Sequence, residues 1–290
     1  MKTLVLLLAA ALCAPAATFY LTISGLGGEA DYTQRFDMWA RDIDASLKKA
    51  GGDSNVTTLE APTRETIRAK MAALASLAKP ADAMVLMLIG HGTFDGADYK
   101  FNVPGPDVTA AELASLLDRI PAVRQCVAVM TSSSGGAIAF LRKPNRVVIA
   151  ATRSGTEKNA TVFARYWAEA LRDPAADSDK NESVSVLEAF LYAQHKTKEF
   201  FDAQKRLATE HAVLEDTGGL AASFSLIRLG ANAAAANDPV KRPLIDRKEA
   251  LEQAIDKLKF EKAALPADEY KKRLAALLLE LARTQEALDK

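Results

Sequence analysis

Cysteine is scarce in this chain of 290 residues, which contains only Cys13 and Cys126. Cys126 is the only one outside the first 17 residues, a segment that we expect to be removed from the protein. A single thiol forms no intramolecular disulfide, so the fold must depend on its hydrophobic core. With 49% hydrophobic and 26% charged residues, the composition suits a globular protein that can bury such a core.

Histidine is scarce as well, since His91, His195 and His211 are the only three. No two of them have the spacing of metal ligands on a helix, and Cys126 lies inside a predicted strand. We therefore expect no transition-metal site. The formal net charge is zero and the chain has no basic block, which argues against a nucleic-acid partner.

The chain also lacks an apolar run long enough to span a bilayer. Its longest candidate, residues 4–12, follows the basic Lys2 and precedes the small residues 14–17, the order found in secretory signal peptides. We therefore predict a signal peptide over residues 1–17 and a secreted or periplasmic protein with no membrane span after cleavage. The alternative is that this run forms a buried first strand.

Apolar strands alternate with amphipathic helices between residues 18 and 230, which predicts an α/β domain with a mainly parallel sheet. The alanine-rich residues 231–239 are predicted to be a linker. Residues 240–290 are predicted to form an αα-hairpin with apolar residues at coiled-coil-like spacing. The predicted strands are 18–24, 55–60, 83–89, 125–131, 146–152 and 220–229, and the predicted helices of the domain are 32–50, 63–78, 109–120, 160–171 and 186–207.

Two of the predicted strands end in residues that carry chemistry. One strand stops at Gly90-His91-Gly92, and the next stops at residues 132–136, which read Ser-Ser-Ser-Gly-Gly. Parallel strands place their carboxyl ends at one edge of a sheet, so His91 and Ser132 are expected to lie near each other. An imidazole that accepts a hydroxyl proton is the core of an acyl-transfer site. Backbone N–H groups of Gly92, Ser133, Gly135 and Gly136 are the candidate oxyanion donors.

These two strand ends resemble the legumain and caspase group of cysteine peptidases, and residues 18–230 resemble a bacterial legumain-type domain. In that group one strand ends in His-Gly and the next in Ala-Cys, followed by a turn of small residues. The resemblance implies a three-layer α/β/α caspase-like fold with His91 as the general base. Ser132 stands where the family has its nucleophilic cysteine, and Thr131 stands where it has alanine.

The exchange of cysteine for serine affects the predicted activity. A serine hydroxyl is much harder to ionise than a thiol, and it normally needs a base that a carboxylate holds in place. Asp95 and Asp98 are the candidate carboxylates. We predict a degenerate, non-proteolytic peptidase homologue that acts as a peptide-binding or assembly module. The alternative is an active hydrolase that uses Ser132 as nucleophile and His91 as base.

Residues 177–188 (DSDKNESVSVLE) match the twelve-residue calcium loop of an EF-hand, and calcium is the one cofactor that we consider. The segment departs from the motif at Glu182, where the sharp turn favours glycine. The alternative is the acidic start of a helix capped by a serine. The candidate ligands are Asp177, Asp179, Asn181, Ser183, Ser185 and Glu188.

Two roles are open for the predicted hairpin of residues 240–290. Its leucine-rich stripe either packs on the α/β domain or serves self-association and the capture of a partner helix. We therefore expect a peptide or protein ligand for this chain and possible self-association through residues 240–290.

Overall fold

The computed structural model describes residues 16–52, 55–236 and 238–290. Residues 1–15 of the predicted signal peptide lie outside the described residues, and its last two residues, Ala16 and Ala17, are described. Every helix in the described ranges is too short or too polar to cross a bilayer.

A six-stranded sheet forms the centre of the α/β domain, with the strand order β10-β8-β7-β3-β1-β2. All neighbouring strands pair in parallel except β10, which runs antiparallel to β8 at one edge. Strand β3 is buried along its whole length, as expected for a parallel strand covered on both faces. The strands are β1 (Thr18–Ser24), β2 (Val56–Glu60), β3 (Ala83–Gly90), β7 (Arg124–Thr131), β8 (Arg146–Ala150) and β10 (Val213–Glu215).

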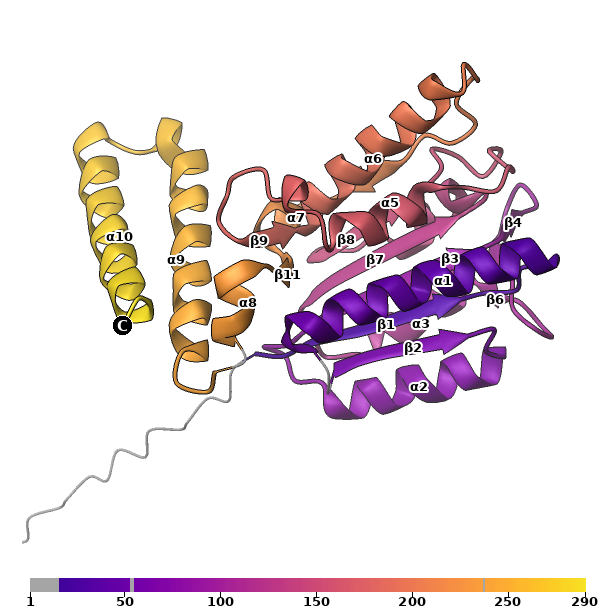
Figure 1. Cartoon of the computed structure of the whole chain (residues 1–290), viewed down its shortest axis with the longest axis horizontal. Helices are drawn as coiled ribbons and strands as arrows, with labels where there is room; N and C mark the ends of the chain where they lie inside the picture. Colours follow the sequence, from indigo (N-terminus) through magenta and orange to yellow (C-terminus); the bar gives the residue numbers. More distant parts are fainter. Residues whose placement is uncertain (1–15, 53–54, 237) are drawn as a thin grey trace, which may run out of the picture.

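Helices cover both faces of this sheet, which confirms the three-layer α/β/α prediction (Figure 1). One core cluster packs α1, α5 and α6 against β3 residues such as Val85 and Met87. The other packs α2, α3 and α4 against the alternate residues Leu86 and Leu88. The helices are α1 (Ala30–Leu47), α2 (Arg64–Leu77), α3 (Ala110–Asp118), α4 (Ile138–Leu141), α5 (Phe163–Ala170) and α6 (Val186–Ala203), with short turns η1 (Lys48–Gly52), η3 (Ser134–Ala137) and η4 (Pro174–Ala176).

A small three-stranded sheet follows His91. Strands β4 (Gly92–Phe94) and β5 (Tyr99–Phe101) form an antiparallel hairpin, and β6 (Val108–Thr109) pairs with β5. Tyr99 and Phe101 are fully buried in the core beneath it, so this sheet is anchored to the domain next to the candidate site.

The structure departs from the prediction at two places. Residues 220–229 form α7 (Leu220–Ser223) and β11 (Ser225–Arg228), and β11 pairs antiparallel with β9 (Ser183–Ser185) in a separate two-stranded sheet. The predicted linker begins as a helix, α8 (Gly230–Ala236), which is tied down by hydrogen bonds from Asn232 to Asn181 and Glu182.

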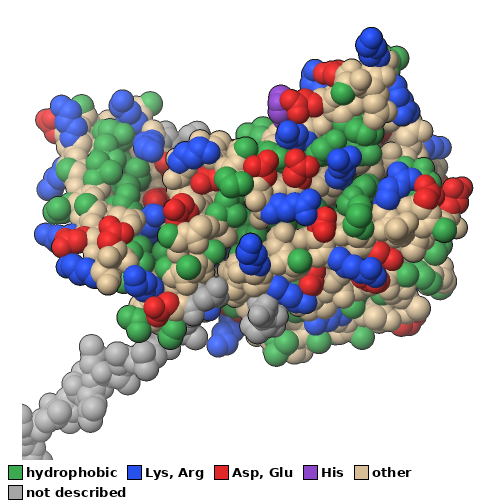
Figure 2. Space-filling model, in the orientation of Figure 1, with side chains coloured by type: hydrophobic (Ala, Val, Ile, Leu, Met, Phe, Trp, Pro, Cys, Tyr) green, Lys and Arg blue, Asp and Glu red, His purple; other side chains and the backbone are tan. Residues whose placement is uncertain are grey.

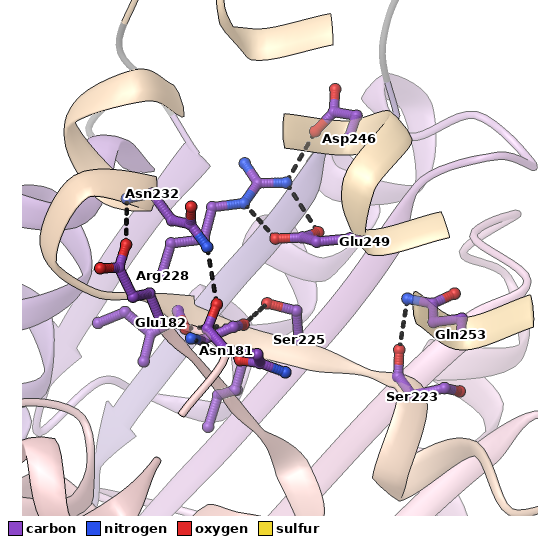
Figure 3. Close-up of polar contacts among 12 residues, drawn as sticks. Asn181, Glu182, Ser223, Ser225, Arg228, Asn232, Asp246, Glu249 and Gln253 are labelled. Carbon is purple, nitrogen blue, oxygen red and sulfur yellow. Dashed lines mark hydrogen bonds and ion pairs between the residues drawn. The ribbon is translucent and has the colours of Figure 1, made fainter. Parts of the chain in front are cut away.

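The C-terminal αα-hairpin is confirmed, and it consists of α9 (Arg242–Phe260), the turn η5 (Glu261–Ala264) and α10 (Ala267–Leu288). Helix α9 packs on the domain, where the Arg228 guanidinium donates hydrogen bonds to Asp246 at 2.7 Å and to Glu249 at 2.7 and 3.0 Å (Figure 3). The Gln253 amide donates to the Ser223 carbonyl at 2.8 Å. Helix α10 packs against α9 and is the more exposed of the two.

Candidate functional site

His91 and Ser132 follow two neighbouring strands at the same edge of the sheet, as the sequence predicted. Gly90, the last residue of β3, pairs with Thr131, the last residue of β7, so His91 and Ser132 are the next residues on adjacent strands. Adjacent strands lie about 4.8 Å apart, which makes the two backbones close neighbours.

The Ser132 hydroxyl forms its hydrogen bonds with the backbone of Gly92. Its Oγ donates to the Gly92 carbonyl at 3.0 Å and accepts the Gly92 N–H at 3.1 Å. The side chain is buried, with 3% of its surface exposed. No hydrogen bond between Ser132 and His91 occurs in the described part of the chain. The hydroxyl proton therefore points to a carbonyl and not to the imidazole, and one candidate oxyanion donor is already occupied.

The His91 ring lies among aromatic side chains of α1. Its centroid is 4.8 Å from that of Tyr32 and 5.1 Å from that of Phe36, and both contacts are edge-on. Burial lowers the pKa of His91, and Arg35 acts in the same direction, whereas a hydrogen bond with the Gly27 backbone opposes them. His91 is therefore neutral at pH 7, the charge state that a general base needs.

The described residues provide no carboxylate bonded to the His91 ring. Asp95 accepts hydrogen bonds from the N–H groups of Asp98 and Ala97 and from Lys100, and these bonds lower its pKa to about 2. Asp95 therefore stabilises its own turn between β4 and β5. A carboxylate that holds the imidazole, as in serine hydrolases, is absent from these contacts, and the group bonded to the ring is the Gly27 backbone.

The other candidate oxyanion donors are also bonded within the protein. The Ser133 N–H donates to the Glu157 carbonyl at 2.8 Å, and the Gly135 N–H donates to Thr152 Oγ1 at 2.9 Å. The Gly136 N–H closes its own turn on the Ser133 carbonyl at 3.0 Å. Their hydrogen bonds hold the turn rigidly at the edge of the sheet.

Ser133 and the two glycines shape this turn. Ser133 has φ 57°, in the left-handed region, and its buried Oγ has no hydrogen-bond partner among the described residues. A Cβ on Gly135 would lie 2.4 Å from the backbone nitrogen of Ser154, and one on Gly136 would lie 2.5 Å from the Phe94 ring. Only glycine fits at these two positions, because the segment after β8 and strand β4 close over the turn.

Cys126 is not a replacement nucleophile. It lies within β7, fully buried, and burial raises the pKa of its thiol to about 12. A protonated thiol inside the sheet has neither the access nor the charge that nucleophilic attack requires.

Two carboxylates with structural roles were missed by the sequence analysis. The Glu157 carboxylate lies 2.7 Å from His211 Nδ1, and the backbone carbonyl of Glu157 accepts the Ser133 N–H. Glu210 is buried and accepts the N–H groups of Val162 and Phe163 at the start of α5. Both residues lie in irregular segments without periodicity, so the sequence carried no signal for their positions.

The predicted calcium loop brings together three of its candidate ligands. Oxygen atoms of Asp177, Asp179 and Glu188 lie within 4.8 Å of one another, a separation that a calcium ion with ligand distances of about 2.3–2.6 Å would fit. Glu182 adopts φ 62°, the left-handed conformation for which the motif uses glycine. Burial raises the pKa of Asp179, and the nearby Glu188 adds to this effect.

All of the candidate ligands also bond within the protein, since even the Asp177 and Glu188 carboxylates accept backbone N–H groups. Asn181 bonds to Asp179 and Ser183, Ser183 Oγ lies 2.6 Å from the Ser225 hydroxyl, and Ser185 forms a capping box with Glu188 at the start of α6. Ser185 therefore caps the acidic start of a helix, as the alternative prediction stated. Calcium binding stays a prediction that rests on the three carboxylates.

Comparison with known proteins identifies the fold. No protein-family model matches the chain, and no curated protein matches its sequence. The crystal structure of caspase-1 from Spodoptera frugiperda matches with a TM-score of 0.51 and 12% identity, over 70% of this chain and 89% of that chain. The Drosophila initiator caspase Dronc matches with a TM-score of 0.49 and 9% identity, over 70% and 80%. The likeness to caspase-1 concerns the fold alone, and this chain has a caspase-like fold.

Proposed function

We propose that this protein is an exported, non-proteolytic homologue of legumain- and caspase-type peptidases that acts as an assembly module. One observation carries the catalytic part of the proposal: the Ser132 hydroxyl donates to the Gly92 carbonyl and accepts the Gly92 N–H. To attack a peptide, it would have to give up both bonds and transfer its proton to an imidazole that has no orienting carboxylate. In serine hydrolases, replacing such a carboxylate lowers kcat about 10⁴-fold.

A fluorophosphonate probe tests this proposal, since such probes react only with activated serines. We expect no labelling of Ser132 in the folded protein. Labelling that disappears in the His91→Ala variant would refute the proposal and establish the alternative function, a hydrolase with Ser132 as nucleophile and His91 as base. The lowered pKa of His91, which favours the neutral imidazole that a general base needs, supports this alternative.

A second experiment asks whether only the nucleophile is missing. In Ser132→Cys, a thiol replaces the hydroxyl next to His91, and Ser134→Cys places a thiol in the same buried turn as a matched control. We expect neither variant to cleave a peptide library, because the oxyanion donors are bonded within the protein. Thiol-dependent cleavage by Ser132→Cys alone would show that the rest of a peptidase site is intact.

The assembly part of the proposal rests on helix α10. Helix α9 is fixed to the domain, whereas α10 contacts α9 along one face and exposes another (Figure 2 shows hydrophobic side chains at the surface of the hairpin). Leu278 and Leu279 are 48% and 54% exposed at the middle of this helix. The exposed residues that share one stripe at helical spacing, here called the α10 stripe, are Lys271, Ala275, Leu278, Leu279, Ala282 and Glu286.

The α10 stripe is complementary to a second copy of itself. When two α10 helices cross antiparallel with Leu278 opposite Leu279 of the other copy, Ala275 faces Ala282 and Lys271 faces Glu286. Alanine allows the two helices to approach closely, and each pair occurs twice across the two-fold axis. Asp268 and Asp289 meet only at the exposed ends, where solvent screens the repulsion. We infer that the protein forms a weak antiparallel dimer through this stripe.

Sedimentation velocity over about 1–300 μM protein tests the dimer, since an interface of one helix pair is small and corresponds to micromolar affinity. We expect Leu278→Glu to abolish association. Lys271→Glu and Glu286→Lys should each weaken it about tenfold, because each turns two attractions into two repulsions. The double exchange K271E/E286K should restore it. A protein that stays monomeric at all concentrations, or a double variant as weak as the single ones, would refute the dimer.

A further inference from the structure

The residue just before strand β1 is tied to a buried carboxylate. The Ala17 N–H donates to Asp82 Oδ1 at 2.8 Å, and the Ala17 carbonyl accepts the Ala83 N–H at 2.8 Å. Asp82 is 5% exposed, and its other oxygen accepts the Lys79 N–H at 2.7 Å. Asp82 therefore holds the start of β1 against the start of β3.

Asp82 is a buried carboxylate without a cation. Among the ion pairs of the described residues, none includes Asp82. A buried charge is costly unless it is paired, and two amide N–H groups compensate this one only in part. The structure therefore has a place for one positive charge at the position of the Ala17 nitrogen.

The sequence supplies a way to create this charge. Residues 14–16 read Ala-Pro-Ala, which is the small-residue pattern of a signal-peptidase site and places the scissile bond between Ala16 and Ala17. Cleavage at this bond would make Ala17 the first residue of the mature protein. Its nitrogen is the atom that already bonds to Asp82.

We propose that the chain is processed between Ala16 and Ala17, one residue before the end of the predicted signal peptide (residues 1–17), and that the new α-ammonium group of Ala17 forms a buried ion pair with Asp82. A signal peptidase adds water across the Ala16–Ala17 amide: the water oxygen goes to the Ala16 carboxylate and its protons to the Ala17 nitrogen. The nitrogen then has three donors and a full charge in place of one N–H. Charge-assisted hydrogen bonds are about twice as strong as neutral ones.

The surroundings accommodate the change. Ala16 is exposed, and Ala16 and Thr18 both line a cavity of about 320 Å³ at the amino ends of the strands, at the edge of the sheet opposite His91. Removal of Ala16 leaves room for water on the ammonium protons that do not face Asp82. Processing therefore stabilises the start of β1 in addition to releasing the leader.

The first test is the N-terminus of the exported protein. We expect intact mass and N-terminal sequencing, after secretion by a bacterial host, to give residues 17–290. This inference rests on the export part of the proposed function, and the outcomes separate the two. A chain exported but cleaved at another bond overturns the inference alone, whereas a chain that is never processed overturns both.

The second test measures the ion pair. Enzymatic Nα-acetylation of Ala17 keeps one N–H donor and removes the charge, so it is the matched control. We expect acetylation to lower the Tm by about 2–4 °C at pH 6. The difference should vanish at high pH, where the free amine loses its proton, and in Asp82→Asn if that variant folds. Equal Tm values for the free and acetylated chains at pH 6 would overturn the ion pair.

Discussion

Glu210 makes the stability of this protein depend on pH. Its carboxylate accepts the N–H of Val162 at 2.8 Å and the N–H of Phe163 at 3.3 Å, at the start of α5. The side chain is 3% exposed. Burial raises the pKa of Glu210 from 4.5 to about 7, with a smaller contribution from Glu157, although the two N–H bonds oppose the shift.

The sign of the effect follows from this raised pKa. Between pH 4.5 and about 7 the folded protein binds a proton at Glu210 that the unfolded chain has released. The contribution of Glu210 to stability is therefore greatest below pH 4.5 and is lost as the pH rises to about 7. A shift of this size corresponds to about 3 kcal/mol in the free energy of unfolding. Above pH 7 the buried carboxylate is charged and carries this cost in full.

The variant Glu210→Gln removes the titration and tests the argument. Urea unfolding at pH 5, 6, 7 and 8 measures the free energy of unfolding. Between pH 5 and pH 8, we expect the free energy of unfolding of the variant to rise by about 2–3 kcal/mol relative to that of the original chain. Glu65→Gln is the control, because Glu65 is an exposed glutamate in the first turn of α2. Parallel stability curves for Glu210→Gln and the original chain would refute the raised pKa.

Three further predictions concern other side chains of the domain. Ser132→Ala should lower the free energy of unfolding by about 1–3 kcal/mol, measured by urea unfolding, because both Gly92 backbone groups lose their partner. Arg228→Met should expose the segment before α9 to limited proteolysis, because two carboxylates on α9 lose their cation. The control Arg247→Met, which breaks an exposed ion pair, should leave the proteolysis of that segment unchanged. Cys126 should react with a thiol reagent at pH 8 only after unfolding, because its pKa is raised to about 12.

The central strands were predictable from the sequence because their signals are local and strong. Strands β3 and β7 are continuous apolar runs that stop at glycine- and serine-rich residues, so the run itself gave both the strand and its end. A crossover helix between them made the strands parallel. The position of His91 beside Ser132 followed from these features and not from any property of the two side chains.

The region between residues 220 and 236 was not predictable because its structure depends on distant partners. Strand β11 pairs with β9, about 40 residues earlier in the chain, and no local pattern marks that pairing. The alanine-rich segment that follows has high helix propensity, but short alanine helices are unstable alone. Asn232 and its bonds to the segment before β9 supply the missing stabilisation.

The orientation of the Ser132 hydroxyl lies outside what residue spacing can predict, because it depends on one rotatable bond. The parity of β7 places Ser132 on the same face as His91, so the sequence favoured a dyad. Strand β4 changes the outcome: it turns back over the end of β7 and presents an N–H and a carbonyl that a small hydroxyl satisfies together.

A cysteine at position 132 would serve that backbone pair poorly, because a thiol is a weak donor and a weak acceptor. Serine is the better residue for joining β7 to β4, and cysteine is the better nucleophile. On the proposal that serine replaces the family's cysteine here, that replacement weakens the chemistry and strengthens the fold. A caspase-like domain whose selected role is assembly would keep serine at this position, since its stability then matters and its reactivity does not.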